Sequence, residues 1–176
     1  DYDMSAMIST LEQTLARRPA GILVVGFDAA LKPAIDRAVE SGVPVITLDS
    51  DVPGSKRLCF IGTGNDAAGV AGARALAQAI GDKGSVAILT KTGQPNLEER
   101  VRGYREELAR HPGIRLVGIG NTNSDPTAAA SAAAAFLQRS PDLAGIGCVE
   151  AAGGIGAGTA VREAGRAGKV KIIAMD

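Results

Sequence analysis

Short apolar runs that alternate with helix-forming segments constrain this chain more than any other feature. The runs have the character of buried strands, and we expect them at residues 21–25, 43–48, 58–61, 85–90, 115–119, 144–149 and 170–175. The expected helices lie at residues 5–17, 29–41, 65–80, 97–110, 126–139 and 155–165. We expect Gly42 to end the second, Asn65 to be the N-cap of the third, and Pro126 to lie in the first turn of the fifth. Strands separated by helices form right-handed crossover units and a parallel sheet. The sequence therefore predicts an α/β fold whose strands are covered on both faces.

One loop departs from this alternation and predicts a boundary. Residues 51–56, which include Pro53-Gly54, join two expected strands without a helix. We therefore expect the chain to pass from one lobe to another near Gly62-Thr63-Gly64. This gives a partial N-terminal lobe over residues 1–63 and a C-terminal lobe over residues 64–176. Because a doubly wound lobe has roughly five or six strands, we expect further strands before and after this chain.

Composition excludes several classes of function. The 19 Lys and Arg residues balance the 19 Asp and Glu residues, so no global field attracts nucleic acid or an anionic membrane. No apolar run approaches the roughly 20 residues that a membrane helix needs, and no signal peptide is visible. Cys59 and Cys148 lie in separate expected strands without a metal-type neighbour, and we expect both to be buried free thiols.

Three expected strands run directly into a carboxylate: Asp49, Glu150 and Asp176. Ligands of open parallel sheets bind in the crevice outside the carboxyl ends of the strands. Acids at that place are costly to desolvate unless a partner or a ligand pairs with them. We expect Asp49 to face a ligand, since a turn role suits Asp51 better. For Glu150 the alternative is a favourable interaction with the positive end of the following helix.

A buried acid that faces a crevice needs a cation, and the helix expected at residues 97–110 offers two. Arg100 and Arg102 both lie in its first turns, and Arg presents a planar fork of donors. The alternative is a solvated helix face with Glu–Arg pairs. Spacing alone leaves both arginines open.

Two glycine-rich segments resemble dinucleotide fingerprints but fail in detail. Residues 62–67 match G-x-G-x-x-A, yet the next expected strand ends at Lys91 where an acid is required. Residues 154–159 form a near miss that ends in Thr159. Close packing explains the glycines of both segments. The single histidine, His111, lies in a helix-stop loop, so a Ser-His-Asp triad is not expected, and neither is a metal or another cofactor.

Four segments together resemble a known family. They are Gly42–Asp51, Ile61–Gly69, Asn96–Tyr104 and Ala164–Asp176, and they occur in the same order and spacing. The chain resembles the ribose-binding-protein-like, type I periplasmic sugar-binding proteins of ABC transporters over essentially its whole length. The resemblance implies two Rossmann-like parallel-sheet lobes joined by a hinge, which close on a sugar, with the first lobe truncated in this chain.

The resemblance also assigns roles to residues. It implies that Asp49 binds sugar hydroxyls, and that an arginine of the 97–110 helix contacts the sugar. Register against the glycine–aromatic pair of that helix favours Arg100 over Arg102. Glu150 stands where the family has an asparagine-type residue, and Asp176 matches an aspartate at a strand end.

Several positions depart from the family pattern. Ser50 stands where the family often has Arg, and Gly26 followed by Phe27 stands where it often has Asn. We include Phe27 and Ser50 in the expected ligand-binding set. No aromatic residue lies near Ser124, so we expect a pocket that is more acidic and less aromatic than a ribose site, and we assign no particular sugar.

The function implied is an extracytoplasmic solute-binding protein that captures a monosaccharide or sugar alcohol for import. Such a protein is no enzyme, needs no cofactor, lies in the periplasm or outside the cytoplasmic membrane, and works as a monomer with the permease subunits of an ABC transporter. The alternatives are the ligand-sensing core of a lactose-repressor-type regulator and that of a membrane receptor. A nucleotide-dependent enzyme is disfavoured by the failed fingerprints.

Overall fold

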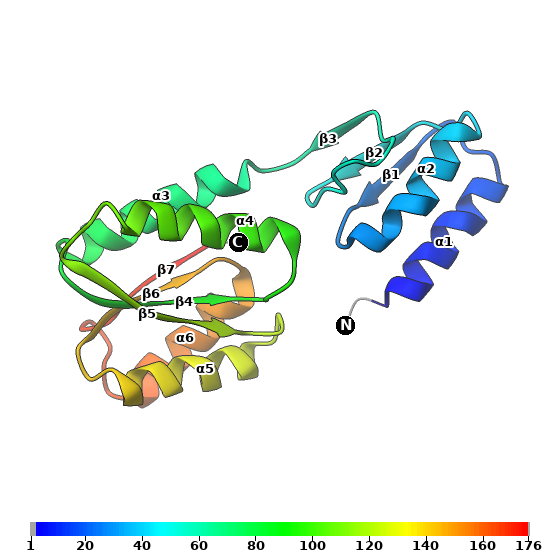
Figure 1. Cartoon of the computed structure of the whole chain (residues 1–176). Helices are drawn as coiled ribbons and strands as arrows, with labels where there is room; N and C mark the ends of the chain where they lie inside the picture. Colours follow the sequence, from blue (N-terminus) through cyan, green and yellow to red (C-terminus); the bar gives the residue numbers. More distant parts are fainter. Residues whose placement is uncertain (1–2, 176) are drawn as a thin grey trace. The chain divides into compact units, whose positions relative to one another are not determined.

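The computed structural model describes residues 3–175 of the chain (Figure 1). Two compact units are present. The first extends up to Thr63 and includes Gln94–Asn96, and the second comprises Gly64–Gly93 and the chain from Leu97 onward. Each unit is built on a parallel sheet, so the predicted α/β class is confirmed. None of the helices in the described part is long and apolar enough to cross a bilayer.

The first unit holds a three-stranded sheet of order β1-β2-β3 and its helices. Its elements are α1 (Met4–Ala16), β1 (Ile22–Val25), the 3₁₀ turn η1 (Ala29–Leu31), α2 (Lys32–Glu40), β2 (Val45–Leu48) and β3 (Cys59–Ile61). The helices pack on one face of the sheet, where Leu11, Ile35 and Val45 belong to one buried cluster.

The other face of this sheet is open in the described chain. The register places Leu23 beside Ile46 and Ile46 beside Cys59, so these three side chains share a face. Leu23 is 67% exposed and Ile61 is 58% exposed, and Cys59 is exposed as well. The prediction of strands covered on both faces is therefore wrong for this sheet, and so is the prediction that Cys59 is buried.

The second unit is a three-layer sandwich. Its elements are α3 (Asn65–Ile80), β4 (Gly84–Thr90), α4 (Pro95–Leu108, which belongs to this unit from Leu97 onward), β5 (Ile114–Asn121), α5 (Pro126–Arg139), β6 (Leu143–Cys148), α6 (Ala151–Glu163) and β7 (Lys171–Ala174). The sheet has the order β5-β4-β6-β7 with all pairs parallel. Helices α3 and α4 cover one face, and α5 and α6 cover the other (Figure 1). Both faces are therefore covered by helices, as predicted for this part of the chain, with β4 and β6 buried and the edge strands β5 and β7 partly exposed.

Helix boundaries follow local chemistry, with two corrections. Gly42 has φ +84° just after α2, and Pro126 opens α5 behind an Asp125 cap, as expected. Helix α6 begins at Ala151 and not at residue 155, because the Glu150 side chain caps it. The prediction that Asn65 is the N-cap of α3 is wrong: the cap position is Gly64, and no side chain caps that end.

Glycine lets α3 and α4 approach until their backbones touch. A Cβ on Gly69 would collide with the carbonyl oxygen of Arg100, and a Cβ on Gly103 would collide with that of Asp66. Each helix thus contributes a glycine at the point where the other passes. This close approach fixes the position of Arg100 on α4 relative to the start of α3.

Candidate functional site

The carboxyl end of the first sheet carries Asp49, directly after β2. Its backbone has φ +58°, a left-handed conformation that few residues other than glycine adopt. Asp and Asn are among the residues that tolerate it best. The backbone N–H of Asp49 donates to the carbonyl of Ile61 at 3.0 Å. The side chain is exposed, and within residues 3–175 its carboxylate accepts no hydrogen bond. The backbone therefore holds Asp49 in place while its carboxylate stays available.

Ser50 and Gly26 join the ends of β1 and β2. The buried hydroxyl of Ser50 donates to the Gly26 carbonyl at 2.7 Å, and the Gly26 N–H donates to the Ser50 carbonyl at 2.8 Å. A Cβ on Gly26 would lie 2.7 Å from that carbonyl oxygen, which explains glycine here in place of an amide residue. The Ser50 hydrogen is thus used inside the protein. Phe27 follows, half-buried, and its contact with a ligand stays a prediction.

Asp51 serves the turn that follows β2. Its Oδ1 accepts from the Thr47 hydroxyl at 2.7 Å and from the Val52 N–H at 2.8 Å, and Oδ2 accepts from Arg57. Burial opposes ionisation of this carboxyl, but the hydrogen bonds from Thr47 and Arg57 outweigh it and lower the pKa of Asp51 below its usual value. Asp51 is therefore a structural acid beside the ligand candidate Asp49.

In the second unit the structure distinguishes the two candidate arginines. Arg100 is 8% exposed. Its Nε donates to Asn65 Oδ1 at 2.9 Å and its Nη1 donates to the Val149 carbonyl at 2.8 Å. Nη2 has no hydrogen-bond partner within the described residues. Arg102 lies on the exposed side of α4 and pairs with Asp66.

Glu150 lies at the same edge as Arg100, one residue beyond Val149. Its Oε1 accepts from the Gly153 N–H at 3.2 Å and from the Thr122 hydroxyl at 2.7 Å. The cap role that we weighed as the alternative is thus present, and a ligand contact through the second oxygen stays a prediction. Burial and then the Glu150 charge raise the pKa of the Cys148 thiol to about 12, so this free, buried thiol stays protonated at neutral pH.

Asp176 lies outside the described residues, so its place at this edge stays a prediction. The last described contact before it is the Met175 N–H, which donates to the Cys148 carbonyl at 2.9 Å. Within residues 3–175, no cluster of three His, Cys, Asp or Glu side chains could hold a metal ion.

Sequence reasoning missed two residues that support this edge, Asn65 and Thr122. Asn65 was assigned to helix capping because an amide next to a helix start usually has that role, but its oxygen accepts from Arg100 instead. Thr122 follows β5 with no motif around it. A polar residue directly after a strand end was the one available signal, and it is the same signal that identified the acids.

Several glycines of the two glycine-rich segments serve packing. A Cβ on Gly154 would lie 2.8 Å from the side chain of Ala174 in β7, and a Cβ on Gly156 would lie 2.5 Å from Ala129 in α5. The first contact is with the sheet, as expected, and the second is with a neighbouring helix. In the segment 62–67, a Cβ on Gly62 would collide with the Phe60 side chain, but a Cβ on Gly64 would meet only Ala67, at 3.9 Å. Packing therefore accounts for Gly62, Gly154 and Gly156 but not for Gly64 or Gly158.

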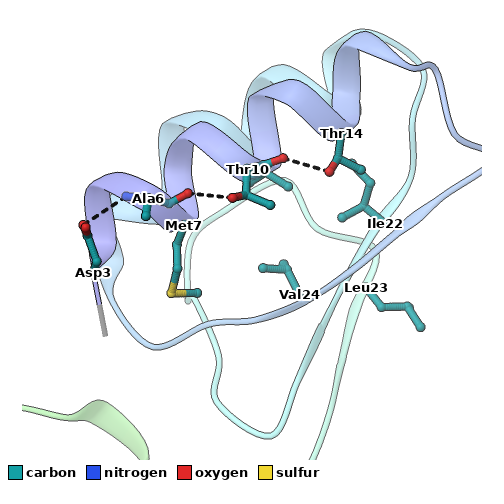
Figure 2. A pocket seen from close by; sticks show the side chains of 9 residues that line it. Asp3, Ala6, Met7, Thr10, Thr14, Ile22, Leu23 and Val24 are labelled. Atoms are coloured by element: carbon teal, nitrogen blue, oxygen red, sulfur yellow. Dashed lines mark hydrogen bonds between the residues drawn. The ribbon is translucent and has the colours of Figure 1, made fainter. Parts of the chain in front are cut away.

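A groove of about 440 Å³ lies between α1 and the edge strand β1 (Figure 2). Its walls are mostly apolar, with Met7 and Val24 beside it. The hydroxyls of Thr10 and Thr14 donate to carbonyls of α1 itself, so they offer little to a polar ligand. None of the predicted site residues lines this groove, and its size alone does not make it the site.

Comparison with known proteins identifies the family. The sequence model of the periplasmic binding protein domain matches residues 1–176. Two parallel sheets with polar side chains at their carboxyl ends agree with this match. The chain belongs to the periplasmic binding protein family, and the resemblance found in the sequence is confirmed.

Individual relatives are sugar-binding proteins. The chain is 26% identical to the D-ribose/D-allose-binding protein of Pseudomonas aeruginosa, over all of this chain and 57% of that protein. The crystal structure of a sugar-binding protein of a sugar ABC transporter from Bacillus halodurans superposes with a TM-score of 0.95 at 38% identity. The structure of the arabinose-binding protein AraP from Geobacillus stearothermophilus superposes with a TM-score of 0.89 at 39% sequence identity. Both structures are matched over all of this chain and 61% of theirs, so the chain spans less than two thirds of these relatives.

Proposed function

We propose that this chain forms the ligand-binding part of an extracytoplasmic solute-binding protein that captures a monosaccharide or sugar alcohol for an ABC transporter. The observation that carries the proposal is the pair at the edge of the second sheet. Arg100 is buried and held by two hydrogen bonds with one guanidinium nitrogen left over. Beside it, Glu150 has one oxygen fixed by two donors.

The chemistry of these groups suits a sugar. A sugar carries many hydroxyls on a small body, and each can donate and accept. Carboxylate oxygens of Asp49 and Glu150 accept from hydroxyls, and Arg100 donates to a hydroxyl or a ring oxygen. Hydrogen bonds to charged groups contribute roughly 1.5–3 kcal/mol each. We propose that Asp176, Phe27 and the Ser50 segment complete the ligand set.

This function needs no catalytic group, and we propose that the protein is not an enzyme. The thiol of Cys148 is buried and protonated at neutral pH, so it is a poor nucleophile. His111 is engaged by Asp82 at 2.7 Å, at the far end of α4 from Arg100. The groups at the two sheet edges are hydrogen-bonding groups suited to holding a ligand without reacting with it.

Partners and place follow from the same proposal. The permease subunits of an ABC transporter would receive the ligand, and the protein would act as a monomer in the periplasm or outside the cytoplasmic membrane. The relatives named above are sugar-binding proteins, which favours transport over the role of a regulator or receptor core.

Thermal-shift screening of the protein against sugars, polyols and nucleotides tests this function. A ligand that binds only the folded state stabilises it and so raises the melting temperature. At a ligand concentration of one hundred times Kd, the free energy of unfolding increases by about 2.7 kcal/mol. We expect D-ribose, D-allose, D-arabinose or a related polyol to do so. Stabilisation by NAD or ATP and by no sugar or polyol would contradict the proposal.

A further inference from the structure

The side chain of Thr122 connects two loops at the carboxyl edge of the second sheet. Thr122 directly follows β5 and is fully buried. Its backbone N–H donates to the Thr90 carbonyl at 2.8 Å, so the residue is tied to the end of β4. Its hydroxyl accepts from the Ser124 N–H at 3.2 Å and donates to Glu150 Oε1 at 2.7 Å. Thr122 thus links the loop after β5 to the start of α6.

The consequence for Glu150 is that its two oxygens differ. Oε1 receives two donors, the Thr122 hydroxyl and the Gly153 N–H. Oε2 has no hydrogen-bond partner within residues 3–175. A carboxylate held at one oxygen by two donors cannot turn freely, so Oε2 keeps one direction. It is the oxygen that remains for an external donor.

The loop that carries Thr122 adopts an unusual conformation. Asn123 and Ser124 both have positive φ, +51° and +54°; asparagine tolerates this left-handed region, but the conformation is costly for Ser124. The Asn123 N–H donates to Asn121 Oδ1 at 3.1 Å, and the same oxygen accepts from the Thr92 N–H at 3.2 Å. Strain of this kind persists only where surrounding contacts hold it, and it often accompanies a functional site.

We infer that Thr122 is a positioning residue for ligand binding: it orients Glu150 so that Oε2 accepts a hydrogen bond from a hydroxyl of the ligand. This inference rests on the proposed sugar-binding function and adds to it a residue that does not itself touch the ligand. It also restricts the ligand at this point, because an ionised carboxylate accepts only, and the ligand group must therefore be a donor.

A double-mutant cycle separates positioning from a purely structural role. The variants are Thr122→Val, which removes the hydroxyl at nearly the same volume, Thr122→Ser, which keeps it, and Glu150→Ser. Ser is a good N-cap, so Glu150→Ser preserves the start of α6 while removing the carboxylate. Isothermal titration calorimetry of the protein with D-ribose, D-allose and D-arabinose gives Kd for each variant.

We expect Thr122→Val to weaken binding of the tightest of these sugars about tenfold, which corresponds to about 1.4 kcal/mol. Thr122→Ser should stay within about twofold of the parent protein. In the Glu150→Ser background, Thr122→Val should change Kd by less than about twofold, since the residue through which it acts is gone. An unchanged Kd in Thr122→Val, or an equal loss in both backgrounds, would overturn the inference.

The parent protein, Thr122→Val, Glu150→Ser and the double variant are also unfolded in urea without ligand. The two substitutions should then be non-additive, because the side chains are in direct contact. Additive effects on the free energy of unfolding would show that Thr122 and Glu150 do not act as a pair, and this would overturn the inference whatever the ligand is. If the parent protein binds none of the three sugars and the unfolding cycle is non-additive, the proposed function fails while the pairing stands.

Discussion

At the scale of single residues, the structure separates groups that the protein uses internally from groups that it leaves for a ligand. The side chains of Asp51, Ser50 and Asn65 form hydrogen bonds with neighbouring protein groups. By contrast, the Asp49 carboxylate and Nη2 of Arg100 have no hydrogen-bond partner within residues 3–175 and stay available to a ligand. The expected site is therefore defined less by which polar residues lie at the sheet edges than by which atoms remain unused there.

Asn65 supports Arg100, and its removal should be costly. Asn65→Ala leaves Nε of the buried guanidinium without its acceptor, and a buried donor that loses its partner costs roughly 1–3 kcal/mol. Asn65→Asp keeps an acceptor oxygen and should cost clearly less. Urea unfolding followed by circular dichroism measures both.

Arg102→Ala is the control for this pair of variants. Arg102 is exposed and its ion pair with Asp66 is on the surface, where water and salt screen the charges and such pairs contribute little to stability. If Asn65→Ala were no more destabilising than Arg102→Ala, the support of Arg100 by Asn65 would be of no energetic consequence.

The lowered pKa of Asp51 predicts that the free energy of unfolding depends on pH. Its pKa is lowered in the folded protein, so the unfolded chain binds more protons over the window between the two pKa values. The stabilisation is therefore present above the unfolded value of about 3.9 and is lost as the pH falls through the lower, folded value. Asp51→Asn should reduce the free energy of unfolding at pH 7, and the difference from the parent protein should shrink towards pH 3.

Asp49→Asn is the matched control, because asparagine tolerates the left-handed conformation at that position and the Asp49 carboxylate accepts no hydrogen bond within residues 3–175. At pH 7 it should therefore lower the free energy of unfolding less than Asp51→Asn does. A constant gap between the parent and Asp51→Asn from pH 7 to pH 3 would contradict the assignment of the low pKa to Asp51.

At the scale of elements, the contact between α3 and α4 depends on glycine. Gly69→Ala places a Cβ against the carbonyl of Arg100, and the two helices must separate to accommodate it. Overpacking of this kind costs roughly 1–3 kcal/mol, and it also moves Arg100. We expect a lower melting temperature and weaker sugar binding.

Gly158→Ala is the matched helical control. A Cβ on Gly158, inside α6, would meet no atom within 4 Å. Alanine is favoured over glycine in a helix by about 1 kcal/mol, so this variant should be slightly more stable than the parent protein. Equal destabilisation by both substitutions would mean that the close approach of α3 and α4 is unimportant.

The strand and helix order could be predicted from the sequence because apolar runs and helical periodicity are local signals. The range predicted for α5, residues 126–139, agrees with the structure, since Asp125 and Pro126 mark its start. The start of α6 at Ala151 was predicted four residues late, although its cap is local: Glu150 Oε1 accepts from the Gly153 N–H. Glycine is a poor helix former, and the glycines at 153, 154 and 156 weaken the helical pattern there. The Asn65–Arg100 contact spans 35 positions and was missed because local patterns carry no information on long-range pairs.

The exposed side chains of the first sheet show a second feature that the sequence pattern does not predict. Leu23 and Ile61 read as buried strand residues because apolar runs usually lie in a core. Whether a helix covers each face depends on the rest of the fold, and in residues 3–175 the face that carries them has no such cover. Sequence pattern predicts the strand but not the number of layers around it.

At the scale of the whole molecule, the two units differ in how they prepare their candidate ligand groups. In the second unit, Arg100 and Glu150 are held by side-chain and backbone hydrogen bonds. In the first, Asp49 is fixed through its backbone while its side chain is exposed. Groups that are already ordered lose less conformational freedom on binding. We therefore expect Arg100 to contribute at least as much to sugar affinity as Asp49.

The most direct test of the central claim is the affinity of the protein for the sugar that stabilises it, measured by calorimetry in Asp49→Ala and Arg100→Ala. With each charged hydrogen bond contributing roughly 1.5–3 kcal/mol, each substitution should weaken binding by about tenfold to a hundredfold or more, while cooperative unfolding is retained. Arg102→Ala, on the same helix, should leave Kd unchanged. Parent-like affinity in both Asp49→Ala and Arg100→Ala would contradict the proposed site.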